Sequence, residues 1–141
     1  MVNDNLKLTG ALTIALNNEV VHEVKNLVVT AGKNYVASRM KDTTKAAMSH
    51  MAVGTGTTVA AAGNTALVAE NDRNTLTSTT VTSNAVIYVC TWAAGDGTAA
   101  LTEAAIFNAA SGGDMLARTV FTVVNKAAAD SMTITWTVTV S

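Results

Sequence analysis

The sequence predicts an all-β domain, an antiparallel β-sandwich of jelly-roll or Greek-key type with one short helix near residues 31–41. Hydrophobic and polar residues alternate with a period of two over most of the 141-residue chain, which is typical of strands with one buried face. The alternating segments are short, and Asn, Gly and Ser residues that favour turns separate them. The length fits one domain, residues 1–141.

Residues 1–30 are predicted to form an N-terminal β-hairpin. One face of its first strand carries Leu6, Leu8, Leu12, Ile14 and Leu16. Asn17 and Asn18 follow, and both tolerate the positive φ that a two-residue hairpin turn requires. The return strand is expected over residues 20–29. This hairpin is a candidate interaction arm.

The middle of the chain changes character. Residues 31–41 contain good helix formers after Gly32, so one short helix is expected there, followed by a surface loop at residues 42–45. A short strand is expected at residues 51–53. It runs into the sequence Gly54-Thr55-Gly56-Thr57-Thr58, and a surface loop follows at residues 59–66.

The second half predicts further strands, to give seven or eight in all. They are expected near residues 74–82, 85–94, 101–107, 115–124 and 132–140. In the last of these, apolar residues occupy one face and four Thr the other, which indicates a sheet with one buried side. The chain contains no Pro, a residue that often protects edge strands. We therefore expect neighbouring subunits to cover the edges, in a homo-oligomer such as a dimer or trimer.

The composition limits the function classes. Charged residues are 13% of the chain, about half of the roughly 25% typical of globular domains, so other chains or hydroxyl groups are expected to cover much of the surface. The formal net charge is −1 and no basic run occurs, which argues against nucleic-acid binding. No apolar stretch approaches 18 residues and the N-terminus lacks signal-peptide features, so we expect no membrane span and no signal peptide, and a chain that folds in a reducing cytoplasm.

The residue patterns predict no catalytic, cofactor-binding or metal site, and hence no enzyme. The glycine-rich segment at residues 54–58 lacks the Lys of a phosphate-binding loop and is interpreted as a structural turn. His22 and His50 have no ligand spacing for a metal. Cys90 lies in an apolar run and is expected to be a buried small hydrophobe.

A few polar and aromatic residues call for an interpretation. Glu103 lies inside an apolar segment, so we expect a fixed cationic partner, either Arg73 or Arg118. Glu70 and Asp72 precede Arg73, which predicts a local charge pair. A further alternative is that Glu70, Asp72 and Glu103 meet in space and form a glycosidase-type cleft. The two tryptophans, at positions 92 and 136, are interpreted as core or interface anchors, and a stacking platform for a sugar or base is the alternative.

Several motifs resemble a group of small virion proteins of tailed bacteriophages, from about residue 20 onward. They are Asn26-Leu27-Val28-Val29-Thr30-Ala31-Gly32-Lys33-Asn34-Tyr35, Met51-Ala52-Val53-Gly54-Thr55-Gly56-Thr57-Thr58, Thr65-Ala66-Leu67 with Glu70 and Arg73, Leu101-Thr102-Glu103-Ala104 with Ile106-Phe107-Asn108-Ala109, Met115-Leu116-Ala117-Arg118-Thr119-Val120-Phe121, and Asp130-Ser131-Met132-Thr133-Ile134-Thr135-Trp136. Ala105 departs from the pattern, because a Gly is common there in the similar modules of tail fibres.

The resemblance implies a phage virion structural protein, made in the host bacterial cytoplasm. One role associated with similar sequences is capsid decoration, in which a cement protein binds the major capsid protein on the capsid exterior as an oligomer and stabilises the shell. The other role is a tail, collar, or tail-fibre or baseplate component. The compact, weakly charged chain favours decoration. Residues 1–30 and 59–66 are then candidate contact segments across neighbouring capsid subunits.

Overall fold

The computed structural model describes residues 6–41 and 44–141, and these residues form nine strands and one helix. Strands account for 54% of the chain, so the predicted β-rich class is confirmed. The elements are β1 (Leu8–Leu16), β2 (Glu19–Val28), α1 (Thr30–Arg39), β3 (His50–Gly54), β4 (Glu70–Thr75), β5 (Ser78–Thr82), β6 (Ala85–Trp92), β7 (Ala99–Phe107), β8 (Met115–Lys126) and β9 (Met132–Val140).

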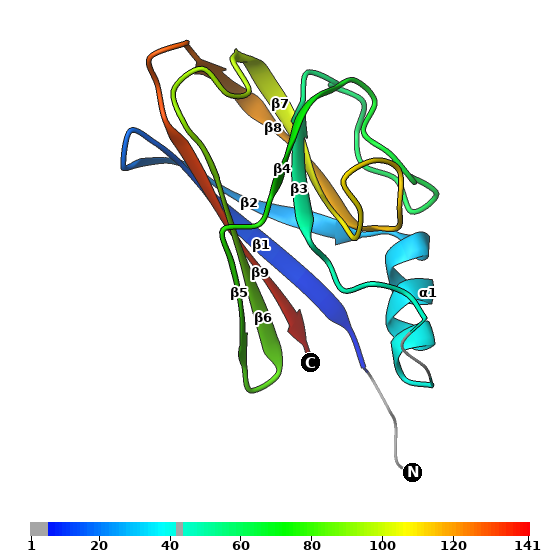
Figure 1. Ribbon diagram of the computed structural model, residues 1–141. Coiled ribbons are helices and arrows are strands. Elements are labelled where there is room, and N and C mark those ends of the chain that lie inside the picture. Colours follow the sequence, from blue (N-terminus) through cyan, green and yellow to red (C-terminus); the bar gives the residue numbers. More distant parts are fainter. Residues whose placement is uncertain (1–5, 42–43) are drawn as a thin grey trace.

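The strands make one curled sheet in the order β4-β3-β7-β8-β2-β1-β9-β6-β5 (Figure 1). Every paired neighbour is antiparallel. The joint between β8 and β2 is narrow, because only Leu27 and Val28 of β2 pair with β8. The sheet therefore has two halves, β4-β3-β7-β8 and β2-β1-β9-β6-β5, whose inner faces enclose the core.

Two strand predictions are wrong in detail. The segment at residues 74–82 was expected to be one strand, but β4 and β5 lie at opposite ends of the sheet order. The chain turns between them, where Leu76 N–H donates to Ser49 O at 2.9 Å and Thr77 N–H donates to Val89 O at 2.7 Å. β4 also begins at Glu70, in a polar stretch without alternation, because pairing with β3 rather than burial makes it a strand. Nine strands result, instead of seven or eight.

The hairpin predicted within residues 1–30 forms β1 and β2, and residues 1–5 of that range lie outside the described residues. Asn17 and Asn18 have φ of 51° and 66°, as a two-residue hairpin turn requires. Leu12 and Ile14 are buried, whereas Leu6 precedes β1 and is 76% exposed. The hairpin lies inside the sheet order, with β9 on one side and β8 on the other, so its outer face is the part open to a partner.

Large apolar side chains fill the interior of the curl. Trp92, Trp136, Ile14 and Ile106 are fully buried, which confirms the tryptophans as core residues. The indole Nε1 of Trp136 donates to Oδ1 of Asn26 on β2 at 2.8 Å. This bond joins β9 to β2 across β1.

The predicted helix is confirmed as α1, in which Gly32 and Tyr35 are buried. The loop expected at residues 42–45 lies partly outside the described residues. Lys45, in the described part, is 3.0 Å from the carboxylate of Asp114. No helix of the described part is long and apolar enough to cross a membrane.

Candidate functional site

The two halves of the sheet have different outer faces. The outer face of β3, β7 and β8 is covered by the chain segment between β3 and β4, residues 55–69, and a second small core lies beneath it. That core consists of Val29, Ala52, Leu67, Ala105, Phe107 and Met115. The outer faces of β1, β6 and β9 carry half-buried or exposed side chains. The first face is therefore closed by the chain itself and the second is open.

A buried ion pair holds the covering segment in place. Glu103 and Arg118 have fully buried side chains, and Nη2 of Arg118 lies 2.9 Å from Oε1 of Glu103. Of the two partners expected for Glu103, the structure selects Arg118. Charges removed from water need further hydrogen bonds to be tolerated, and the covering segment supplies them.

Backbone N–H groups of the covering segment complete the environment of the Glu103 carboxylate. Oε2 accepts from Gly56 N–H and Ala69 N–H, both at 2.8 Å, and Oε1 accepts from Val68 N–H at 3.0 Å. Burial favours the neutral acid, but the hydrogen bonds from Ala69, Val68, Arg118 and Gly56 outweigh it and lower the pKa of Glu103 below its ordinary value. The carboxylate is therefore ionised and acts as an internal anion.

Arg118 extends the same network to the middle of the covering segment. Its Nη1 donates to Oδ1 of Asn64 at 3.0 Å and its Nη2 donates to Thr58 O at 2.9 Å. On the other side, Ala62 O accepts from the N–H of Thr30 at 2.8 Å. Residues 59–66 are a loop, as predicted, and these bonds attach it to the sheet and helix of its own chain.

Gly56 is required by the close approach of the carboxylate. A Cβ there would lie 2.6 Å from Cβ of Val68 and 2.8 Å from the carboxyl carbon of Glu103, so Gly56→Ala displaces one of these groups. We expect a loss of about 1–3 kcal/mol in the free energy of unfolding, measured by urea denaturation. Gly63→Ala is the matched control, since nothing lies within 4 Å of its Cβ; equal losses in the two variants would contradict this assignment.

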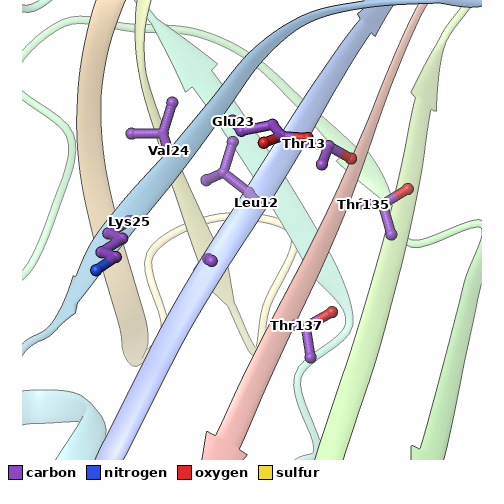
Figure 2. A pocket seen from close by; sticks show the side chains of 8 residues that line it. Leu12, Thr13, Glu23, Val24, Lys25, Thr135 and Thr137 are labelled. Carbon is purple, nitrogen blue, oxygen red and sulfur yellow. The ribbon is translucent and has the colours of Figure 1, made fainter.

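A groove of about 470 Å³ runs along β1 on the open face. Figure 2 shows the residues that line it: Ala11, Leu12, Thr13, Glu23, Val24, Lys25, Thr135 and Thr137. A second groove adjoins it along the same strand, because Ala11, Lys25 and Thr137 line both. Small side chains on β1 form the floor, and longer ones on β2 and threonines on β9 form the walls.

The open face around the groove is poor in charge. Because the alternate residues of β1, β6 and β9 are buried, the others face outward. They are Thr9, Ala11, Thr13 and Ala15 on β1, Ala85, Ile87, Val89 and Thr91 on β6, and Thr133, Thr135, Thr137 and Thr139 on β9. None of these twelve carries a charge, and Glu23 and Lys25 are the charged residues that line the groove. Hydroxyl and aliphatic groups thus make up a wide continuous surface.

The histidines and the cysteine lie apart from the groove. The His22 ring lies 6.2 Å from that of Phe121, and His50 contacts the hydroxyls of Ser49 and Thr75. Cys90 is buried, and burial, followed by the charge of Asp72, raises its pKa to about 12. Within residues 6–41 and 44–141, no group of three or more His, Cys, Asp or Glu is placed to hold a metal ion.

The predicted local charge pair is confirmed between Glu70 and Arg73, at 2.7 Å. Arg73 also lies 3.7 Å above the ring of Phe107 and donates to the carbonyls of Ala109 and Gly112. It therefore fixes β4 to the loop after β7. Asp72 takes no part in this pair, and its Oδ2 is buried without a hydrogen-bond partner.

The groove and the N–H groups around Glu103 were not predicted. The four threonines of the last strand signalled an outward face, but which strand lies beside them is set by long-range pairing of β9 with β1 and β6. Comparison of the chain with protein-family models, with curated proteins and with solved structures finds no match.

Proposed function

We propose that the protein is a structural component of a tailed-phage virion, a capsid decoration protein that binds the outer capsid surface and stabilises the shell. The observation that carries the proposal is the open face of β1, β6 and β9, with its twelve uncharged outward residues. A surface of this kind binds another protein without a large cost for removing charges from water. The phage-like motifs supply the virion context.

We also propose that the curled sheet is a two-layered sandwich. The halves β4-β3-β7-β8 and β2-β1-β9-β6-β5 act as the two layers of a jelly-roll or Greek-key sandwich around one core. A layer built this way is rigid, so that little conformational entropy is lost when its outer face docks. The clamped segment over β7 and β8 adds to this rigidity.

Shell stabilisation follows from linkage. A protein that binds only the assembled shell shifts the equilibrium away from disassembly, by an amount that grows with its free concentration. The major capsid protein is the expected partner. The second role, in the tail, collar or baseplate, uses the same kind of face but at far fewer sites per particle.

The test adds purified protein to capsids of the encoding phage that lack it. We expect saturable binding and a higher temperature of shell disruption, followed by co-sedimentation and by calorimetry. Ile87→Glu combined with Thr135→Glu places two negative charges on the open face and should weaken binding by at least about tenfold. Thr122→Glu, at an exposed position of β8, is the matched control; capsids that neither bind the protein nor gain stability would refute the proposal.

A further inference from the structure

The strand β5 forms one end of the sheet and has a free edge. Among the described residues it pairs with β6 alone, and its five residues, Ser-Thr-Thr-Val-Thr, are all exposed. An edge strand directs alternate N–H and C=O groups away from its neighbour. Natural edges are usually protected by charges, Pro or a bulge, but this strand contains no charge and no Pro, and its register with β6 has no shift. Val81 is 72% exposed on it.

The other end of the sheet is partly covered, at the C-terminal end of β4. There, β4 lies against β6, because Nδ2 of Asn74 donates to Thr91 O at 3.1 Å. The thiol of Cys90 on β6 also approaches the carbonyls of Asn74 and Thr75, at 3.8 and 3.6 Å. The two ends of the sheet order are thus unlike, and within residues 6–41 and 44–141 β5 is the end strand without such a contact on its free edge.

We propose that β5 pairs with β5 of a second copy, antiparallel about a two-fold axis at Thr80. The strand is self-complementary in this register. On one face Thr80 lies opposite Thr80 and Ser78 lies opposite Thr82, so hydroxyl groups meet hydroxyl groups. On the other face Thr79 lies opposite Val81, so the β-branched side chain of Thr79, with its methyl group, faces the exposed valine. Cross-strand Thr pairs and pairs with β-branched residues are favourable in antiparallel sheets.

Because β5 is self-complementary about a two-fold axis, we expect a second copy of this chain, rather than a strand of another protein, to pair with its free edge. An isologous contact closes on itself, so the product is a dimer and not a fibre. Because five residues bury much less than the roughly 800 Å² per partner of a standard interface, the dimer should dissociate at about micromolar concentrations. In the dimer the open faces of two copies become parts of one sheet. The inference does not depend on the virion proposal, since it concerns the purified chain.

The test is sedimentation equilibrium of the purified protein from low micromolar to millimolar concentration. We expect a reversible monomer–dimer equilibrium for the wild type. Thr80→Lys places two lysines opposite each other on the axis and should raise the dissociation constant by about tenfold or more. Thr122→Lys, at an exposed position of a strand in the other half of the sheet, should leave it unchanged.

A mixture of variants tests the register. Thr80→Glu alone should also dissociate, whereas an equimolar mixture of Thr80→Lys and Thr80→Glu should restore the dimer as a heterodimer, because opposite charges then face each other. Circular dichroism checks that each variant keeps the fold. The inference is overturned if the wild type is a monomer throughout the series, which leaves the edge to a strand of another protein. It is equally overturned if Thr80→Lys dimerises as well as the wild type.

Discussion

Replacing Glu103 by Gln is expected to lower the free energy of unfolding by about 3–5 kcal/mol, the range for breaking a buried ion pair on one side. The substitution leaves the guanidinium of Arg118 buried without its counter-charge. It also places an NH₂ group where one carboxylate oxygen accepts hydrogen bonds from the backbone. Either orientation of the amide therefore faces a donor with a donor. Urea denaturation followed by circular dichroism measures the loss.

Two comparisons distinguish a loss of stability caused by the broken ion pair from a loss caused by poorer packing. Lys45→Met breaks a partly exposed ion pair with Asp114 and should cost less than about 1 kcal/mol. The double variant Glu103→Gln, Arg118→Met removes both buried charges and should recover part of the loss. If Lys45→Met were as damaging as Glu103→Gln, the special role of the buried pair would be wrong.

The difference in stability between the wild type and Glu103→Gln depends on pH, and the direction of this dependence follows from the pKa of Glu103. Because the pKa of Glu103 is lower in the folded protein than its ordinary value of 4.5, the ionised carboxylate stabilises the fold above that value. This contribution is lost as the pH falls through the lowered pKa. The difference in stability between wild type and Glu103→Gln should therefore be constant near neutral pH and shrink in acid below pH 4.5.

Trp136→Ala is the second variant with a large expected effect, a loss of about 3–5 kcal/mol in the free energy of unfolding. The indole is fully buried and its removal leaves a cavity at the centre of the curl. It also deprives Oδ1 of Asn26 of its donor. The side chain of Asn26 lies directly against Gly10 on β1, in the place that a Cβ at residue 10 would occupy.

Trp136→Phe divides this loss into its parts. It keeps most of the volume but removes the N–H donor, so a loss of about 1–3 kcal/mol is expected for the unsatisfied Asn26. Val59→Ala, at a side chain that is 79% exposed, should change stability by less than about 0.5 kcal/mol. Equal stability of the Phe variant and the wild type would show that the Asn26 bond contributes nothing.

Local patterns predicted most elements of this fold. The hairpin turn at Asn17 and Asn18, the helix near residues 31–41 and the alternating strand at the C-terminus were all predicted correctly. Their signals are short-range, because turn chemistry and alternation act within a few residues. The break between β4 and β5 could not be predicted, since it depends on hydrogen bonds from Leu76 and Thr77 to distant strands.

The functional surfaces were predictable only in part. A lone carboxylate among apolar residues correctly signalled that Glu103 has a fixed partner. The choice of Arg118 over Arg73 depends on the register of β7 with β8, which places Glu103 opposite Val120 and Ala105 opposite Arg118. The open face required the order of strands, because no single segment contains it. Its signals in the sequence were the low charge of the composition and the four threonines on one face of the last strand.

The number of copies of this chain per purified virion tests most directly whether the protein decorates the capsid. Quantitative mass spectrometry against the major capsid protein as an internal standard measures it. If the protein decorates the capsid, we expect hundreds of copies in a fixed ratio to the capsid protein, and their loss should lower the temperature of shell disruption. A count of three, six or twelve copies would place the protein in the tail or neck, and absence from the particle would contradict the virion assignment altogether.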